Sequence, residues 1–186
     1  MTCVTENIVI RKGKTFRMPV RYAVKPYIYK AISAIEASVP LTLTIAAHGV
    51  PNGWRVALVG SADDEVIPPR HVEWRGATYV DNDTIQLNEV LDDEDATHIV
   101  YETPASLVGL TARMQIRASV TSTTVLLTPT IALDDATKMI TVTISAVNTA
   151  AIDWRRGVYE LEVEDAGGIV TQLLEGRVEV KSEVTR

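Results

Sequence analysis

Nine consecutive residues, 109–117, constrain the fold of this chain more than any other stretch. In Gly-Leu-Thr-Ala-Arg-Met-Gln-Ile-Arg, apolar side chains at 110, 112, 114 and 116 alternate with polar side chains at 111, 113, 115 and 117. Successive side chains of a β-strand point to opposite faces, so this period of two predicts a strand with one buried and one solvated face. We expect the apolar positions to lie in a core, and Arg113 and Arg117 to lie at the surface.

The composition favours strands elsewhere too. Val, Ile and Thr dominate many windows of the 186 residues, and Phe16 is the only phenylalanine. This length suits one domain or two small ones. No run approaches the ~20 apolar residues that span a bilayer, and residues 1–6 do not begin a secretory signal. Cys3 is the only cysteine, so no intrachain disulfide is expected.

The net charge of −6 hides an uneven distribution. Residues 1–31 contain seven Lys or Arg against Glu6 alone, whereas residues 63–102 contain twelve acidic residues against Arg70 and Arg75. Such asymmetry can encode a surface for a partner, or a head-to-tail contact between copies. In the simpler interpretation, the two segments face each other or solvate the outer faces of strands.

The first segment predicts a hairpin. Ile8 and Ile10 alternate with polar residues, residues 11–14 form a turn, and the alternation resumes over 16–22. Pro19 indicates an edge strand, because proline cannot donate a ladder hydrogen bond.

Short strands separated by turn residues fill the rest of the chain. Residues 31–39 suit either a short helix or an irregular linker, and 48–53 is a turn. We expect strands at 41–47, 54–58, 72–74, 78–80, 84–87, 98–101, 110–117, 123–127, 131–133, 139–144, 158–163, 169–174 and 176–180. Residues 145–154 break the alternation and suggest one helical turn. Nearly every connection is short, as antiparallel topology permits.

The C-terminal strands resemble a small β-sandwich family of structural proteins in tailed bacteriophages. The matching segments are 109–117, 140–144, Trp-Arg-Arg-Gly-Val-Tyr-Glu-Leu at 154–161, 174–180 and 183–186. They are similar to the N-terminal sandwich of phage baseplate upper proteins, which couples receptor-binding parts to the tail. The resemblance implies an all-β fold, an antiparallel immunoglobulin-like β-sandwich.

The middle of the chain has a resemblance of its own. Residues 44–53, Thr-Ile-Ala-Ala-His-Gly-Val-Pro-Asn-Gly, followed later by 83–87, are similar to a small β module of phage tail and fibre proteins. Trp54 and Arg55 depart slightly from the usual form. In the sandwich family the opening hairpin lies shortly before the 109–117 strand, so the intervening stretch is an insertion. We therefore expect a discontinuous sandwich, 1–30 and 103–186, with an inserted β module at 31–102.

No residue pattern indicates catalysis, a metal or a cofactor. The three histidines, His48, His71 and His98, lack metal-ligand spacing, and His48 is expected to hold its turn. The acidic run at 92–95 lacks the spaced ligands and glycine of a calcium loop. Sequence cannot exclude paired carboxylates that cleave glycosides, but the long repeats of phage polysaccharide-degrading enzymes are absent. No nucleophile elbow, P-loop or dinucleotide motif occurs, so we expect a non-enzymatic protein.

Three groups of residues are candidates for a partner interface. The basic group could touch DNA, although an acidic patch on a neighbouring subunit is the better match. The acidic run is its potential complement. Trp54 and Trp74 could contact a partner or form a sugar-binding platform, whereas Trp154 is expected to pack over a sandwich end. The candidate residues are Arg11, Lys12, Lys14, Arg17, Arg21, Trp54, Trp74, Asp92, Asp93, Glu94 and Asp95.

Together these observations predict a structural protein of a tailed-phage virion. It is made in the host cytoplasm and joins tail or neck components to fibres or receptor-binding parts, in several symmetric copies. Its partners are other virion proteins, with no nucleic acid and no membrane. Two alternatives stay open, namely a capsid decoration protein and a carbohydrate-binding module that attaches to the host.

Overall fold

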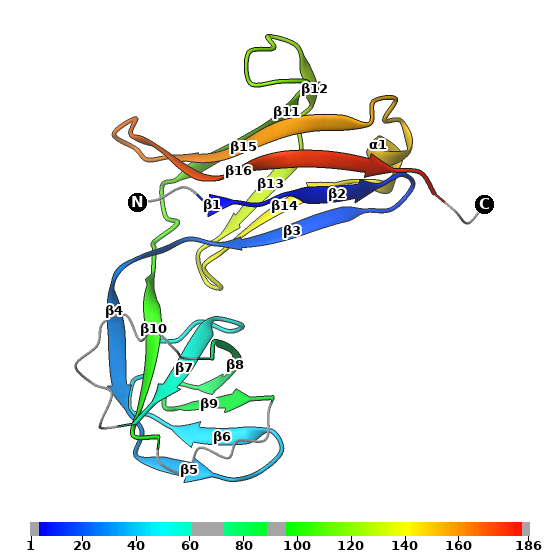
Figure 1. The fold of residues 1–186 in the computed structure, drawn as a ribbon. Coiled ribbons are helices and arrows are strands. Elements are labelled where there is room, and N and C mark those ends of the chain that lie inside the picture. The colour runs from blue at the N-terminus through cyan, green and yellow to red at the C-terminus, as the bar shows by residue number, and fades with distance from the viewer. Residues whose placement is uncertain (1–3, 61–72, 89–95, 184–186) are drawn as a thin grey trace. The chain divides into compact units, whose positions relative to one another are not determined.

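The computed structural model describes residues 4–60, 73–88 and 96–183, and within these ranges the chain is mostly β-strand (Figure 1). This confirms the all-β class. The described helix, α1 (Ala146–Ala150), is short, and no helix in the described ranges is long and apolar enough to cross a membrane. The chain divides into two compact units, unit 1 (Met1–Tyr22 and Ser106–Arg186) and unit 2 (Ala23–Ala105).

The limits of these units differ from the expected boundaries at 30 and 103. Strand β4 (Ala23–Ala31) pairs along its length with β10 (His98–Pro104), from Ala23 opposite Pro104 to Ala31 opposite His98. Both strands therefore belong to unit 2. The pair Lys25–Pro26 does not end the first unit. It lies inside β4, and β4 is an edge strand that tolerates proline.

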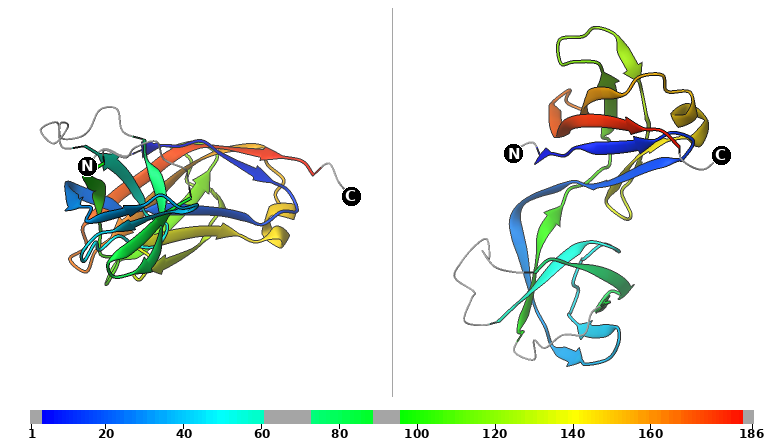
Figure 2. Two further views of the ribbon diagram at one scale, coloured as in Figure 1. Left: turned by 90° about the horizontal axis from the view of Figure 1, so that it is seen from below. Right: turned by 45° about the vertical axis from the view of Figure 1, so that its right-hand side comes forward.

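Unit 1 consists of two sheets. The larger sheet runs in the order β1 (Val4–Thr5), β16 (Val170–Lys181), β15 (Arg156–Glu164), β11 (Thr111–Arg117) and β12 (Val125–Leu127), and β2 (Ile8–Arg11) also pairs with β16. The smaller sheet contains β13 (Thr130–Asp134), β14 (Met139–Ile144) and β3 (Phe16–Arg21). Figure 2 shows α1 near one end of these strands, and the Thr149 hydroxyl lies 2.9 Å from the carbonyl oxygen of Lys14 in the β2–β3 turn.

One apolar core joins the two sheets of unit 1. Ile10, Ile116 and Leu161 of the larger sheet are fully buried, and so are Ile140 and Val142 of the smaller sheet, all in a single cluster. Strand β11 behaves largely as its alternation predicts, because Met114 and Ile116 are buried whereas Arg113 is exposed. The apolar residues at 110 and 112 are only partly buried, as is Arg117, near the two ends of the strand.

The predicted hairpin over residues 8–22 is wrong. Strand β2 pairs in parallel with β16, whereas β3 pairs antiparallel with β14 in the other sheet. Most strand pairs are antiparallel as expected, but β1 and β2 both run parallel to β16. Alternation shows which side of a strand is buried, and two strands that face each other across a core have the same alternation as two strands of a hairpin. Pro19 does lie on an edge strand, β3.

The described residues of unit 2 form one seven-stranded sheet. Its order is β4, β10, β7 (Arg55–Val59), β8 (Arg75–Asp81), β9 (Thr84–Leu87), β6 (Leu41–Thr44) and β5 (Ala34–Glu36). Residues 34–36 therefore form a strand, and neither of the two expectations for residues 31–39, a short helix or an irregular linker, describes them. The strand expected at 72–74 lies partly outside the described residues, and β8 begins only at Arg75. Along β7 the last four residues are all buried, because apolar clusters cover both of its faces.

Candidate functional site

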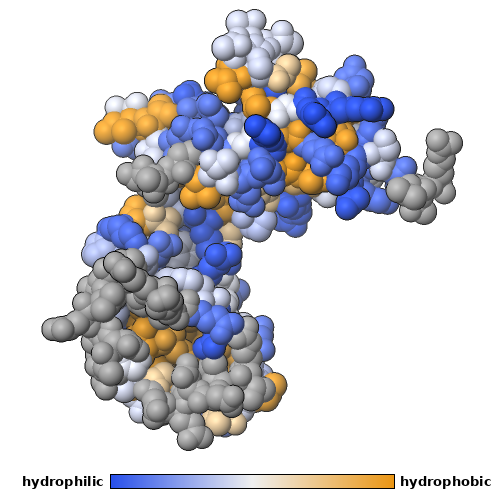
Figure 3. Space-filling model, in the orientation of Figure 1, coloured by the Kyte–Doolittle hydropathy of each residue, from blue (hydrophilic) through white to orange (hydrophobic). Residues whose placement is uncertain are grey.

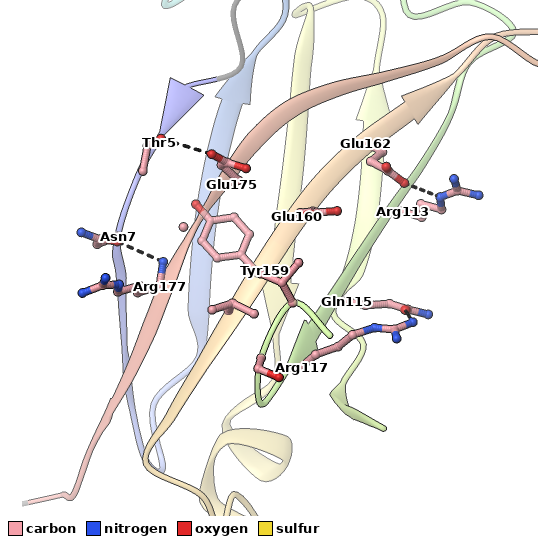
Figure 4. Close-up of a pocket in the computed structure, with 14 residues that line it drawn as sticks. Thr5, Asn7, Arg113, Gln115, Arg117, Tyr159, Glu160, Glu162, Glu175 and Arg177 are labelled. Atoms are coloured by element: carbon pink, nitrogen blue, oxygen red, sulfur yellow. Dashed lines mark hydrogen bonds and ion pairs between the residues drawn. The ribbon is translucent and has the colours of Figure 1, made fainter. Parts of the chain in front are cut away.

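An open cleft of about 850 Å³ lies on the outer face of the larger sheet of unit 1. We call it the sheet cleft. In Figure 4, Arg113, Gln115 and Arg117 stand on one side, Thr5 and Asn7 stand on the other, and Glu160 and Glu175 lie between. The remaining lining residues are Ser119, Val120, Val158, Tyr159, Glu162, Gly176 and Arg177. Its walls are therefore mainly polar and charged side chains.

Strand pairing sets these side chains in transverse rows. In the central row, Gln115 lies opposite Glu160, Glu160 lies opposite Glu175, and Glu175 lies opposite Thr5. Side chains directly opposite each other in a sheet have Cβ atoms about 5 Å apart, so each row offers a dense series of polar groups. The rows on either side contain Arg113 opposite Glu162, and Val158 opposite Arg177.

The arginines of β11 are held in place by their neighbours. Arg113 donates a hydrogen bond of 2.6 Å from Nε to Glu162 and lies 3.7 Å from Glu164. The hydrogen bond and the charge of Glu162 raise the pKa of the Arg113 guanidinium. Arg117 donates to the backbone oxygen of Ser122 and to the side-chain oxygen of Gln115, both at 2.7 Å. Both guanidinium groups are thus oriented before any ligand binds.

Glu160 and Arg177 differ from these residues. Glu175 accepts hydrogen bonds from Gln172 at 3.1 Å and from Thr5 at 3.5 Å. By contrast, no hydrogen bond or ion pair of the Glu160 carboxylate or the Arg177 guanidinium occurs with another described residue. The cleft therefore contains one acceptor group and one donor group that are both unpaired there.

Gly176 and Tyr159, which lie opposite each other, fix the segment between β1 and β2 beside the cleft. Tyr159 lies opposite Gly176, and its hydroxyl donates to the backbone oxygen of Glu6 at 2.8 Å. The amide of Glu6 in turn donates to the backbone oxygen of Glu175 at 2.8 Å. A Cβ atom at position 176 would overlap the Glu6 carbonyl oxygen, so glycine lets the segment between β1 and β2 lie against β16.

The predicted basic interface residues lie in two places rather than on one hairpin face. Arg11, Lys12 and Lys14 lie at the end of β2 and in the turn after it, whereas Arg17 and Arg21 are exposed on β3 of the smaller sheet. The Lys14 amine lies 2.9 Å from the Glu183 carboxylate. The basic residues do not share one face because β2 and β3 belong to different sheets and do not form the predicted hairpin.

The two candidate tryptophans have different environments. Trp54 is only 2% exposed, and its indole N–H donates to the backbone oxygen of Glu102 at 2.9 Å. Trp54 is therefore a core residue of unit 2, which corrects its assignment to an interface. Trp74 is 37% exposed and stacks on Tyr27, with ring centroids 6.2 Å apart. Asp92, Asp93, Glu94 and Asp95 lie outside the described residues.

His48 has a structural role in unit 2. It is fully buried, its Nδ1 accepts from the Val50 amide at 2.9 Å, and its Nε2–H donates to the Asp81 carbonyl at 2.7 Å. These partners require the neutral imidazole with its proton on Nε2. The Tyr101 hydroxyl donates to the His48 carbonyl, and burial raises the pKa of Tyr101.

The structure also places the remaining histidines and potential metal ligands. His98 contacts the Thr97 hydroxyl at 3.0 Å, and His71 lies outside the described residues. Among the described residues, no three His, Cys, Asp or Glu side chains are grouped to hold a metal ion.

Sequence reasoning missed the sheet cleft. The available signal was the charged or amide residue at alternate positions in three strands, 113–117, 160–162 and 175–177. The sequence does not indicate that β11, β15 and β16 are neighbours, so each set of positions is typical of an ordinary solvated strand face. Figure 3 shows hydrophilic side chains with smaller apolar areas among them on the face of unit 1 in view. Neither a protein-family model nor a curated protein sequence matches this chain.

Proposed function

We propose that this chain is a non-enzymatic structural protein of a tailed-bacteriophage virion. It joins tail or neck components to fibres or receptor-binding parts, and it acts in several symmetric copies through protein–protein contacts. The observation that carries the proposal is the organisation of the chain, in which one β unit with its own core interrupts another between β3 and β11. Two separately cored units on one chain give a linking protein two binding surfaces.

We infer in addition that unit 1 is an immunoglobulin-like sandwich. In such domains one sheet contains strands A, B, E and D, and the other contains C, F and G, with C′ added in the variable type. Strands β3, β14 and β13 correspond to B, E and D, and strands β11, β12, β15 and β16 correspond to C, C′, F and G. Unit 2 is then an insertion in the connection between B and C. The parallel pairing of β1 and β2 with β16 departs from a purely antiparallel version.

The resemblance to phage β-sandwich proteins supports the same proposal. Its matching segments contain β11, all of β14 except Met139, most of β15 and residues 174–180 of β16. These strands form the middle of both sheets. The resemblance therefore rests on the residues that build unit 1 rather than on scattered loops.

Exposed arginines on unit 1 are the proposed contacts for an acidic neighbour. Arg11 and Arg17 are exposed, and neither forms an ion pair with another described residue. Opposite charges on two subunits mainly increase the association rate and fix the orientation of docking.

Quantitative mass spectrometry of purified virions tests the function. We expect the chain in the virion, in a copy number that fits the symmetry of the tail, and antibody labelling at the tail or neck. Absence of the chain from intact virions would overturn the proposal. Labelling of the head would instead support a capsid decoration protein.

A substitution refines this experiment. Arg17→Glu should lower incorporation of the chain into virions, whereas Arg156→Glu, a charge reversal at an exposed position of β15, should leave it unchanged. Equal incorporation of both variants would contradict a role for Arg17 in docking.

A further inference from the structure

We propose that the sheet cleft of unit 1 binds an uncharged carbohydrate. This proposal does not rest on the virion function, because it follows from the chemistry of the cleft alone. It also places carbohydrate recognition away from Trp54, which is buried in unit 2.

The charges of the cleft are balanced. Arg113, Arg117 and Arg177 face Glu160, Glu162 and Glu175, so three cations meet three carboxylates over one surface. A phosphate or polyanion would gain from the arginines but would be repelled by the carboxylates, and a cation would meet the opposite conflict. A ligand without net charge avoids both penalties.

Few aliphatic side chains line the cleft. Among its lining residues the aliphatic side chains are Val120 and Val158, and the hydroxyl of Tyr159 is already used by Glu6. Pockets for drug-like molecules are mostly hydrophobic, and peptides usually bind through buried anchor side chains. A polyhydroxylated ligand needs few such contacts, since hydrogen bonds supply its recognition.

The two unpaired groups match hydroxyls. The Glu160 carboxylate only accepts hydrogen bonds and the Arg177 guanidinium only donates them, whereas a hydroxyl does both. Glu160 lies directly opposite Glu175, two residues from Arg177, so the two groups are diagonal neighbours about 7 Å apart at the backbone. In Figure 4 the Arg177 side chain points towards Asn7 and away from Glu160. Hydroxyls on different sugar units of one glycan can therefore donate to Glu160 and accept from Arg177.

The rest of the cleft is organised in advance. Arg113 is held by Glu162, Arg117 by Gln115 and Ser122, and Glu175 by Gln172. Binding then restricts few side chains, which lowers its entropic cost. Without an aromatic platform facing the ligand, we expect a dissociation constant in the range of about 0.1 to 10 mM.

Glycan-array screening of the full chain, followed by NMR titration, tests the proposal. The ¹⁵N-labelled protein is titrated with the best neutral glycan of the array, with tetragalacturonate as an anionic probe and with an uncharged Ser/Gln decapeptide. We expect saturable shifts of the Gln115, Glu160 and Arg177 amides with the neutral glycan alone. Glu160→Ala and Arg177→Ala should each weaken binding at least about tenfold, the loss expected for a hydrogen bond to a charged group.

Matched control variants distinguish the loss of a cleft residue from the loss of any exposed charged residue. Arg156→Ala in unit 1 and Glu36→Ala in unit 2 remove the same residue types at exposed positions outside the cleft, and both should bind as the parent does. Three results would each overturn the proposal. These are no neutral glycan bound more tightly than about 10 mM, binding of tetragalacturonate or the peptide only, and unchanged binding by both cleft variants. None of them bears on whether the chain is part of a virion.

Discussion

Units 1 and 2 are both made of strands, but they keep their polar groups in different places. In unit 1 the core between the two sheets is apolar, the hydroxyls of the buried residues Thr149 and Tyr159 donate to backbone oxygens, and the arginines and glutamates of the cleft lie on the outer face. In unit 2 the His48 imidazole is buried between the Val50 amide and the Asp81 carbonyl, and the buried Tyr101 hydroxyl donates to the backbone carbonyl of His48. The buried polar side chains of unit 1 are thus hydroxyl groups, whereas unit 2 also buries an imidazole that forms hydrogen bonds at both ring nitrogens.

This comparison predicts where each unit is vulnerable. The outer face of unit 1 should tolerate substitution, since its side chains contact solvent, whereas the interior of unit 2 should not tolerate the loss of one polar partner. Each prediction below is measured on the full chain by residue-resolved amide hydrogen exchange, so that the response of each unit is read separately.

The largest effect is expected for His48→Ala in unit 2. The substitution leaves the Val50 amide and the Asp81 carbonyl without their imidazole partner and opens a cavity. We expect a loss of about 4 kcal/mol in the stability of unit 2, with unit 1 unchanged. His98→Ala is the control, because His98 is half-buried, and it should cost less than about 1 kcal/mol. Similar losses for both variants would contradict the structural role of His48.

In unit 1, a large loss of stability is expected from Gly176→Ala, which adds a single methyl group. The new Cβ overlaps the Glu6 carbonyl and crowds the Tyr159 ring, so the segment between β1 and β2 must move away from β16. We expect a loss of about 3 kcal/mol, because backbone must shift to relieve the overlap. Gly76→Ala is the control, since nothing lies within 4 Å of a Cβ there. Equal stability of the two variants would contradict this close approach.

Tyr101 should make unit 2 sensitive to alkaline pH. Burial raises the pKa of Tyr101 in the folded state above its ordinary value of 10.0, so above that pH the unfolded chain loses the proton first. The stabilisation is fully present below about pH 10 and is lost as pH rises towards the folded-state pKa. Tyr101→Phe should flatten this dependence while costing about 1.5 kcal/mol near neutral pH through the lost bond to His48. An unchanged alkaline profile would contradict the assignment.

The stability of unit 1 should depend on pH in the acidic range, and more weakly than the stability of unit 2 depends on alkaline pH. The Lys138 amine and the Leu107 amide hold the pKa of Asp135 below its ordinary value, and the hydroxyl and amide of Thr137 do the same for Asp134. The resulting stability is present above about pH 4 and is lost as pH falls through the lowered pKa. Asp135→Asn should reduce this acid dependence in unit 1, and the exposed Asp153→Asn should not. The same acid profile in both variants would contradict the prediction.

Alternation predicted local structure better in unit 1 than in unit 2. The strands expected at 110–117 and 139–144 match β11 and β14 within one residue, because each has one buried face and one face that is more accessible to solvent. In unit 2, β7 is buried on both sides, so its alternation marks no solvated face. The apolar alternation of Trp54 with Val56 and Leu58 does match their shared core, although Trp54 was assigned to an interface. The sheet cleft was missed for a different reason, since its residues come from strands whose pairing joins distant parts of the chain.

By itself the sequence determined the all-β fold class, the buried faces of the clearest strands, the edge position of Pro19 and the glycine-containing turn at His48. These features depend on neighbouring residues, because a period of two and the conformation of a turn are local properties. The tertiary structure decided that β2 pairs with β16 rather than with β3, that β4 belongs to unit 2, and that Glu160 and Arg177 share one cleft. Strand partners are chosen by contacts between distant segments around a common core, and alternation records the side of a strand but not its neighbour.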